Sequence, residues 1–134
     1  MASRIKSLET SVNEKALALM ITLYHNNRCS KSREALAVLE QSGKPFVVRY
    51  YLDQTLSVAE LTALLQALQL PARDLLRTKE DEYKTLELIN PALTEQQLIE
   101  AMVQHPKLIE RPILQVGDQA VVARPADKML VLLA

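Results

Sequence analysis

The sequence predicts an α/β fold in which a helical segment separates a β-α-β half from a β-β-α half. Three observations support this prediction. Two apolar runs flank a helical pattern in the first part of the chain, two capping boxes open amphipathic helices in the middle, and a Gly-Asp pair separates two apolar runs near the end. The chain has 134 residues, 49% of them apolar, which is enough for one domain with its own core.

The first half contains two strand patterns and one helix pattern. Residues 20–24 form an apolar run that predicts a buried strand, and residues 30–41 show helical periodicity that Gly43 ends. Phe46–Leu52 is rich in β-branched and aromatic residues and predicts a second strand. The apolar face of the predicted helix consists of Ala35, Leu36, Val38 and Leu39.

The middle of the chain is helical. Ser57–Glu60 is a capping box that opens a helix, and Pro71 suits the first turn of a short helix. Residues 79–89 are mixed and predict another short helix. Thr94–Gln97 is a second capping box, and its helix should end before Pro106. The apolar side of the helix that follows the first capping box consists of Leu61, Leu64, Leu65 and Leu68.

The last part of the chain predicts a hairpin and a closing helix. Ile113–Val116 and Gln119–Val122 are the hairpin strands, and Gly117 and Asp118 form the turn between them. Pro125 then opens a helix that continues through Leu133. The whole order matches a thioredoxin-like mixed sheet with a helical insertion between the β-α-β and β-β-α halves.

Residues 20–134 are expected to form this domain, and residues 1–19 an N-terminal extension or leader that is flexible or helical. Charges run throughout the extension, so it lacks the long apolar region of a secretory signal, and Ser11–Glu14 could cap a helix within it. No apolar run approaches membrane-spanning length.

Composition narrows the function classes. Lys+Arg and Asp+Glu both number 16, which argues against a general nucleic-acid or membrane-surface partner, since both usually need a basic excess. The single cysteine cannot form an internal disulfide, and no Cys and His cluster suggests a metal site. A reducing, cytoplasmic setting is the simplest interpretation.

The most informative residue is that cysteine, Cys29. It falls between the first predicted strand and helix, where free backbone N–H groups and the helix dipole favour a thiolate and could also hold an oxyanion. Many lone cysteines are inert core residues. The polar neighbours of this one, from His25 to Ser32, argue against burial, so we interpret Cys29 as a nucleophile.

The residues around and after Cys29 refine the chemistry. Ser32 stands where a C-x-x-C oxidoreductase has its second cysteine, so a disulfide of Cys29 must be with another molecule. Arginine is well shaped to hold a tetrahedral oxyanion, and one candidate ends the short helix after Pro71 while two others flank the hairpin. These candidates are Arg77, Arg111 and Arg124. Pro112 would lie where thioredoxin-type folds place a cis proline, and the sequence leaves its isomer open.

Together these features resemble the glutaredoxin-coupled arsenate reductase (ArsC) family. The resemblance extends over residues 21–134, and its specificity comes from the joint occurrence of the motifs in order. The matching stretches are Ile21–Arg33, Tyr51-Leu52, Leu75–Arg77, Gln104–Pro106, Glu110–Ile113 and Ala123–Pro125.

The resemblance implies the reduction of arsenate to arsenite, with no bound cofactor, glutathione as reductant and glutaredoxin as the partner that regenerates the thiol. It implies that Cys29 is the nucleophile, that Arg77, Arg111 and Arg124 bind the oxyanion, and that His25 belongs to the active-site turn. Residues expected to support that turn are Asn26, Ser30, Ser32 and Pro112.

Two alternatives stay open at the level of sequence. One is a non-enzymatic regulator of the Spx type that binds RNA polymerase, which Ser32 disfavours because those proteins usually carry C-x-x-C. The other is a glutathione-dependent thiol oxidoreductase with no arsenic role, which C-x-x-S favours and the three arginines disfavour.

Overall fold

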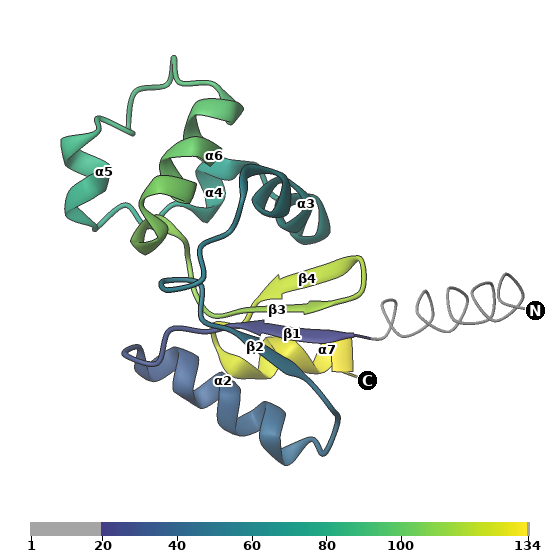
Figure 1. Ribbon diagram of the computed structural model, residues 1–134. Helices are drawn as coiled ribbons and strands as arrows, with labels where there is room; N and C mark the ends of the chain where they lie inside the picture. The colour runs from purple at the N-terminus through teal and green to yellow at the C-terminus, as the bar shows by residue number, and fades with distance from the viewer. Residues whose placement is uncertain (1–19, 134) are drawn as a thin grey trace, which may run out of the picture.

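The structure, a computed structural model, describes residues 20–133 and contains a mixed four-stranded sheet with helices on both faces (Figure 1). The predicted extension, with its possible cap at Ser11–Glu14, lies outside the described residues. The sheet has the order β2-β1-β3-β4, in which β1 pairs parallel with β2 and antiparallel with β3, and β3 pairs antiparallel with β4. The strands are β1 (Ile21–Tyr24), β2 (Val47–Arg49), β3 (Ile113–Val116) and β4 (Gln119–Val122).

One face of the sheet is covered by α2 (Ser30–Gln41) and by the C-terminal η2 (Ala126–Met129) and α7 (Leu130–Leu133), which lie together below the sheet in Figure 1. The closing helix thus begins as a 3₁₀ turn rather than as the regular helix that Pro125 predicted. The apolar face predicted for α2 is only partly buried, through Ala35 and Leu39. The core on this side consists of Ile21, Leu23, Ala35, Leu39, Leu114, Ala123, Met129 and Leu133.

The other face carries the helical insertion, at the top of Figure 1. Both predicted capping boxes are present: the hydroxyl of Ser57 accepts from the N–H of Glu60 at 3.0 Å, and that of Thr94 accepts from the N–H of Gln97 at 3.1 Å. The buried leucines of α3 and α6 each contribute on the order of 1.5–3 kcal/mol by leaving water. The insertion consists of α3 (Val58–Leu68), α4 (Ala72–Leu75), α5 (Asp81–Thr85), α6 (Glu95–Gln104) and η1 (Pro106–Leu108). The prediction of a thioredoxin-like α/β fold with a helical insertion is confirmed.

The second predicted strand, Phe46–Leu52, is wrong in its length. Pairing with β1 stops at Arg49, and the chain turns directly afterwards, where the carbonyl of Tyr50 accepts from the N–H groups of Asp53 and Gln54. The guanidinium of Arg49 stabilises this turn by donating to the carbonyls of Gln54 and Thr55 and by pairing with a carboxylate of α3. The turn directs Tyr51 into the interior, where only 1% of its surface is exposed.

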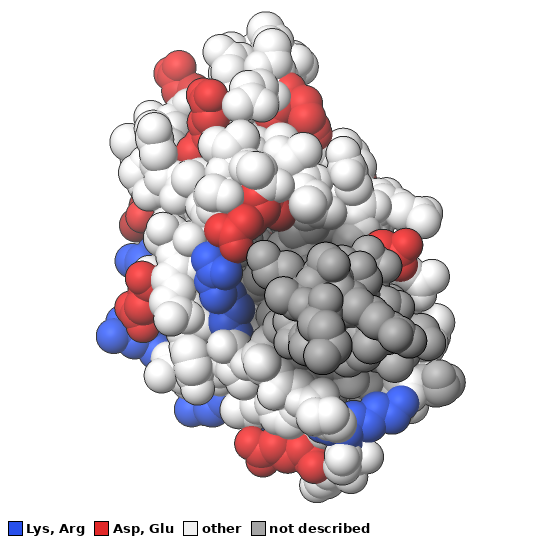
Figure 2. All heavy atoms as spheres, turned by 45° about the vertical axis from the view of Figure 1, so that its right-hand side comes forward, with Lys and Arg blue, Asp and Glu red and all other residues white. Residues whose placement is uncertain are grey.

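The surface shows mixed charge. On the face in Figure 2, acidic side chains are the charged groups over the helical insertion at the top, whereas the lower part carries both acidic side chains and Lys and Arg side chains. Among the helices described between residues 20 and 133, none combines the length and apolar character needed to cross a bilayer.

Candidate active site

The local structure at Cys29 is a tight turn that leads from β1 into α2. The N–H of Cys29 donates to the carbonyl of Asn26 at 3.0 Å, and the carbonyl of Cys29 accepts the first helical hydrogen bond, from Arg33, at 3.0 Å. Cys29 is therefore the N-cap residue of α2, and its backbone angles are extended. Its side chain makes no capping hydrogen bond. Cys29 is half-buried at this strand-to-helix turn, so it is not one of the fully buried core residues.

The surroundings of the sulfur favour the thiolate. Partial burial alone would raise the pKa of Cys29, but backbone N–H groups of the first helical turn, that of Ser32 above all, and the positive guanidinium of Arg111 outweigh it. The pKa of Cys29 therefore lies below its ordinary value. A thiol with a lowered pKa and partial access to solvent has the properties of a nucleophile.

The lowered pKa can be measured by alkylation, because iodoacetamide reacts with the thiolate and not with the thiol. The rate of Cys29 alkylation should rise with pH through a midpoint below that of free cysteine in the same buffer. Arg111→Gln removes a positive charge beside the sulfur and should move this midpoint upward. Lys128→Gln removes an exposed charge on η2 and should leave the midpoint unchanged; equal midpoints in all three proteins would contradict the assigned cause.

Arg111 has the features of an anion ligand beside the thiol. It precedes Pro112, with which it forms a cis peptide bond, and β3 begins at the next residue. The Nε atom of Arg111 is buried and has no hydrogen-bond partner among the described residues. A buried donor without a partner is costly, and an oxyanion bound beside Cys29 would satisfy it.

The other two predicted arginines have partners of their own in the described part of the chain. Nη1 of Arg77 lies 2.7 Å from a carboxylate oxygen of Glu80 and 3.3 Å from the carbonyl of Lys107. Nη1 of Arg124 lies 3.9 Å from a carboxylate oxygen of Glu110. The structure thus brings Arg111 to the sulfur and leaves Arg77 and Arg124 in contact with glutamates.

The supporting turn is organised by Ser32. Its hydroxyl lies 2.7 Å from Nδ1 of His25 and accepts from the N–H of Asn26 at 3.0 Å. His25 is only 2% exposed, and burial lowers its pKa, as does the positive charge of Arg33, although a hydrogen bond with the backbone of Ser32 partly opposes that shift. A neutral His25 bonded to Ser32 is suited to fixing the shape of the turn. Ser30, the first residue of α2, is exposed, and Pro112 is buried.

Tyr51 belongs to a stretch that carries the family resemblance, but it is not among the predicted site residues. Burial raises the pKa of Tyr51 to about 12, while the nearby positive charges of Arg111 and Arg77 act in the opposite direction, as does hydrogen bonding with the side chain of Asn26. Tyr51 therefore lies among the residues that surround Cys29. Because Tyr51 lies in an apolar run, the sequence pattern indicates a core residue of a strand. Its proximity to the site follows from the turn after Arg49, which the pattern does not predict.

Between residues 20 and 133, His, Cys, Asp and Glu side chains do not gather in groups of three or more that could hold a metal ion. The groups that the site brings together include one thiol of lowered pKa, an adjacent guanidinium and a buried phenol.

Comparison with known proteins gives consistent matches over this same region. The model of the ArsC family matches residues 24–132. The chain is 45% identical to the uncharacterized protein YfgD of Escherichia coli K12, over 82% of this chain and 93% of that protein. It is 40% identical to an arsenate reductase of Haemophilus influenzae, over 86% of this chain and all of that protein. A solved arsenate reductase structure from Vibrio cholerae matches with a TM-score of 0.82 and 45% identity, over 84% of this chain and 97% of that one.

Proposed function

The chain belongs to the ArsC family, and from this premise we propose that it is an arsenate reductase that uses Cys29 as nucleophile, glutathione as reductant and glutaredoxin to regenerate the thiol. The observation that carries the proposal is the pairing of Cys29 with Arg111: a thiol of lowered pKa lies beside a guanidinium whose Nε is buried without a partner. The names of relatives at 40–45% identity support arsenate as the substrate.

In the first step, the thiolate of Cys29 attacks the arsenic of dihydrogen arsenate and an As–O bond breaks. The departing hydroxyl takes the proton of the second arsenate hydroxyl, so that water leaves and a thioester of As(V) forms. Arg111 neutralises the oxygens and donates its free Nε–H to one of them. Arg77 and Arg124, now paired with glutamates, are proposed to exchange those partners for the oxyanion.

In the second step, the glutathione thiol attacks the arsenic of the adduct, and a second As–O bond breaks as that oxygen leaves as water. The two sulfurs then join in a disulfide while both As–S bonds break. The two thiols together lose two electrons, which arsenic takes as it changes from As(V) to As(III) and leaves as arsenite. A sequence with one cysteine has no internal thiol to break this disulfide, so a glutaredoxin thiolate must attack the glutathione sulfur and release Cys29.

The role proposed for His25 is to position the turn. Its Nδ1 contacts Ser32, which also receives the N–H of Asn26, so His25 acts on the sulfur through the backbone of the turn. Tyr51 is proposed to form the buried wall of the site, next to Asn26, Arg111 and Arg77.

The proposal is tested by coupled turnover of purified protein with arsenate, selenate or a plain disulfide as substrate. Arsenate should be turned over repeatedly only when glutathione and glutaredoxin are both present. Without glutaredoxin, the expected result is one equivalent of arsenite and a glutathione adduct on Cys29. Faster turnover of the plain disulfide than of arsenate would instead identify a thiol oxidoreductase.

A further inference from the structure

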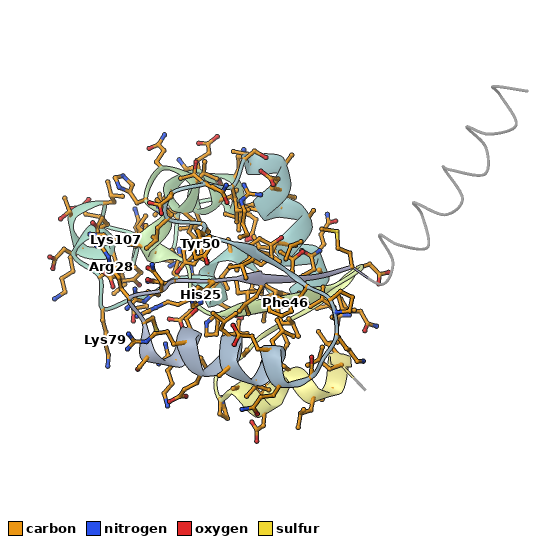
Figure 3. The ribbon with its side chains drawn as sticks, turned by 60° about the horizontal axis from the view of Figure 1, so that its bottom comes forward. His25, Arg28, Phe46, Tyr50, Lys79 and Lys107 are labelled. Atoms are coloured by element: carbon orange, nitrogen blue, oxygen red, sulfur yellow. The ribbon has the colours of Figure 1, made fainter. Side chains whose placement is uncertain are left out.

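A cavity opens beside the Cys29 turn. It has a volume of about 370 Å³ and is bounded by the turn before Cys29, by the turn after β2 and by the end of α6 with η1. Figure 3 shows His25, Arg28, Tyr50 and Lys107 gathered at the end of the molecule where β1 stops, with Phe46 at the far end of the sheet. Arg28, on its wall, directly precedes the nucleophile.

The charges on the wall of this cavity have an unusual arrangement. Two cations, Arg28 and Lys107, and two anions, Asp53 and Glu82, all line it. Within residues 20–133, none of these four side chains forms an ion pair, although the same region contains other salt bridges. Opposite charges that share a cavity without pairing are suited to a ligand that itself carries both signs.

The size and the remaining wall point to a short peptide. Small-molecule sites commonly enclose about 300–1,000 Å³, so this cavity is larger than a single oxyanion needs. Asn27 and Gln104 supply amide groups that can pair with peptide bonds. The ring of Tyr50, in edge contact with His25 at 5.7 Å, and the side chain of Leu52 supply apolar surface.

We propose that this cavity is the subsite for glutathione in the second step of the reaction. Arg28 and Lys107 bind its carboxylates, and Asp53 and Glu82 bind its ammonium group. Because Arg28 adjoins Cys29, a tripeptide held here can direct its thiol to the arsenic on Cys29. The inference rests on the proposed function for the role of the thiol, but binding itself can be measured without turnover.

The probe is S-methylglutathione, whose blocked sulfur cannot react with Cys29. Its dissociation constant for the purified protein should rise about tenfold in Lys107→Glu and in Glu82→Lys, since each change replaces an attraction with a repulsion. Lys128→Glu, which alters an exposed lysine on η2, is the matched control and should bind as the unmodified protein does. Equal weakening in the control, or no measurable binding to the unmodified protein, would overturn the proposal.

A second probe tests the orientation. S-methylglutathione with an acetylated amino group lacks the positive charge assigned to Asp53 and Glu82, so it should bind more weakly to the unmodified protein. In the double variant Asp53→Asn, Glu82→Gln, acetylation should have little further effect, because residues that share one interaction give non-additive losses. Fully additive losses would rule out the assigned orientation.

The two proposals fail in different ways. If the protein binds the probe through this cavity but does not reduce arsenate, the proposed reaction is wrong and the glutathione subsite stands. If arsenate is reduced with glutathione and Lys107→Glu leaves both the probe affinity and the KM for glutathione unchanged, the subsite is wrong and the reaction stands.

Discussion

Replacing Cys29 with serine should reduce arsenite formation to the uncatalysed background. A serine hydroxyl stays protonated near neutral pH, so the neighbouring N–H groups and Arg111 have no anion to stabilise and the attack on arsenic is lost. The assay is the coupled turnover with glutathione and glutaredoxin. Because Cys29 is the only cysteine, this variant should also form no glutathione adduct, which mass spectrometry checks independently.

This loss can be separated from a loss of folding. Cys29 is the N-cap residue of α2 and its side chain makes no capping hydrogen bond to the helix, whereas serine is among the preferred N-cap residues. The variant should therefore unfold at the same temperature as the unmodified protein or higher. Retained turnover in a folded Cys29→Ser protein would falsify the assignment of the nucleophile.

The helices that the sequence predicted best are those whose first turn is fixed by hydrogen bonds between residues close together in the chain. In each capping box, two side chains three residues apart bond to one another's backbone N–H groups, as Ser57 and Glu60 do in α3 and Thr94 and Gln97 do in α6. The first residues of these helices can therefore be predicted without knowledge of the fold. The position of Cys29 could be predicted for the same reason, since a strand followed by a helix fixes the turn between them.

The features that the sequence did not predict depend on side-chain contacts that follow neither helical nor strand periodicity. The turn at Tyr50 needs the guanidinium of Arg49 to reach Thr55 and the carboxylate of Glu60, and that turn alone brings Tyr51 to the site. The cavity wall likewise joins Arg28 to Lys107, which lies in a segment whose pattern only indicated a helix end. Periodicity reports which residues are buried, but it does not report which buried residues meet.

Arg111 should be the most sensitive of the three arginines, because it alone combines contact with Cys29 and a buried donor without a partner. Arg111→Lys keeps a positive charge near the sulfur but removes the planar fork that can donate two parallel hydrogen bonds. Losing a hydrogen bond to a charged group costs about 1.5–3 kcal/mol, so the KM for arsenate should rise roughly 10–100-fold.

The same substitution separates the two roles of this side chain. The lysine charge should hold the alkylation midpoint of Cys29 closer to that of the unmodified protein than Arg111→Gln does, while both variants lose affinity for arsenate. Arg33→Lys, the same change at an exposed position of α2, is the control and should affect neither quantity. If Arg111→Lys keeps the KM for arsenate of the unmodified protein, Arg111 serves only the pKa of the thiol, and the oxyanion must be held by Arg77 and Arg124 after they release their glutamates.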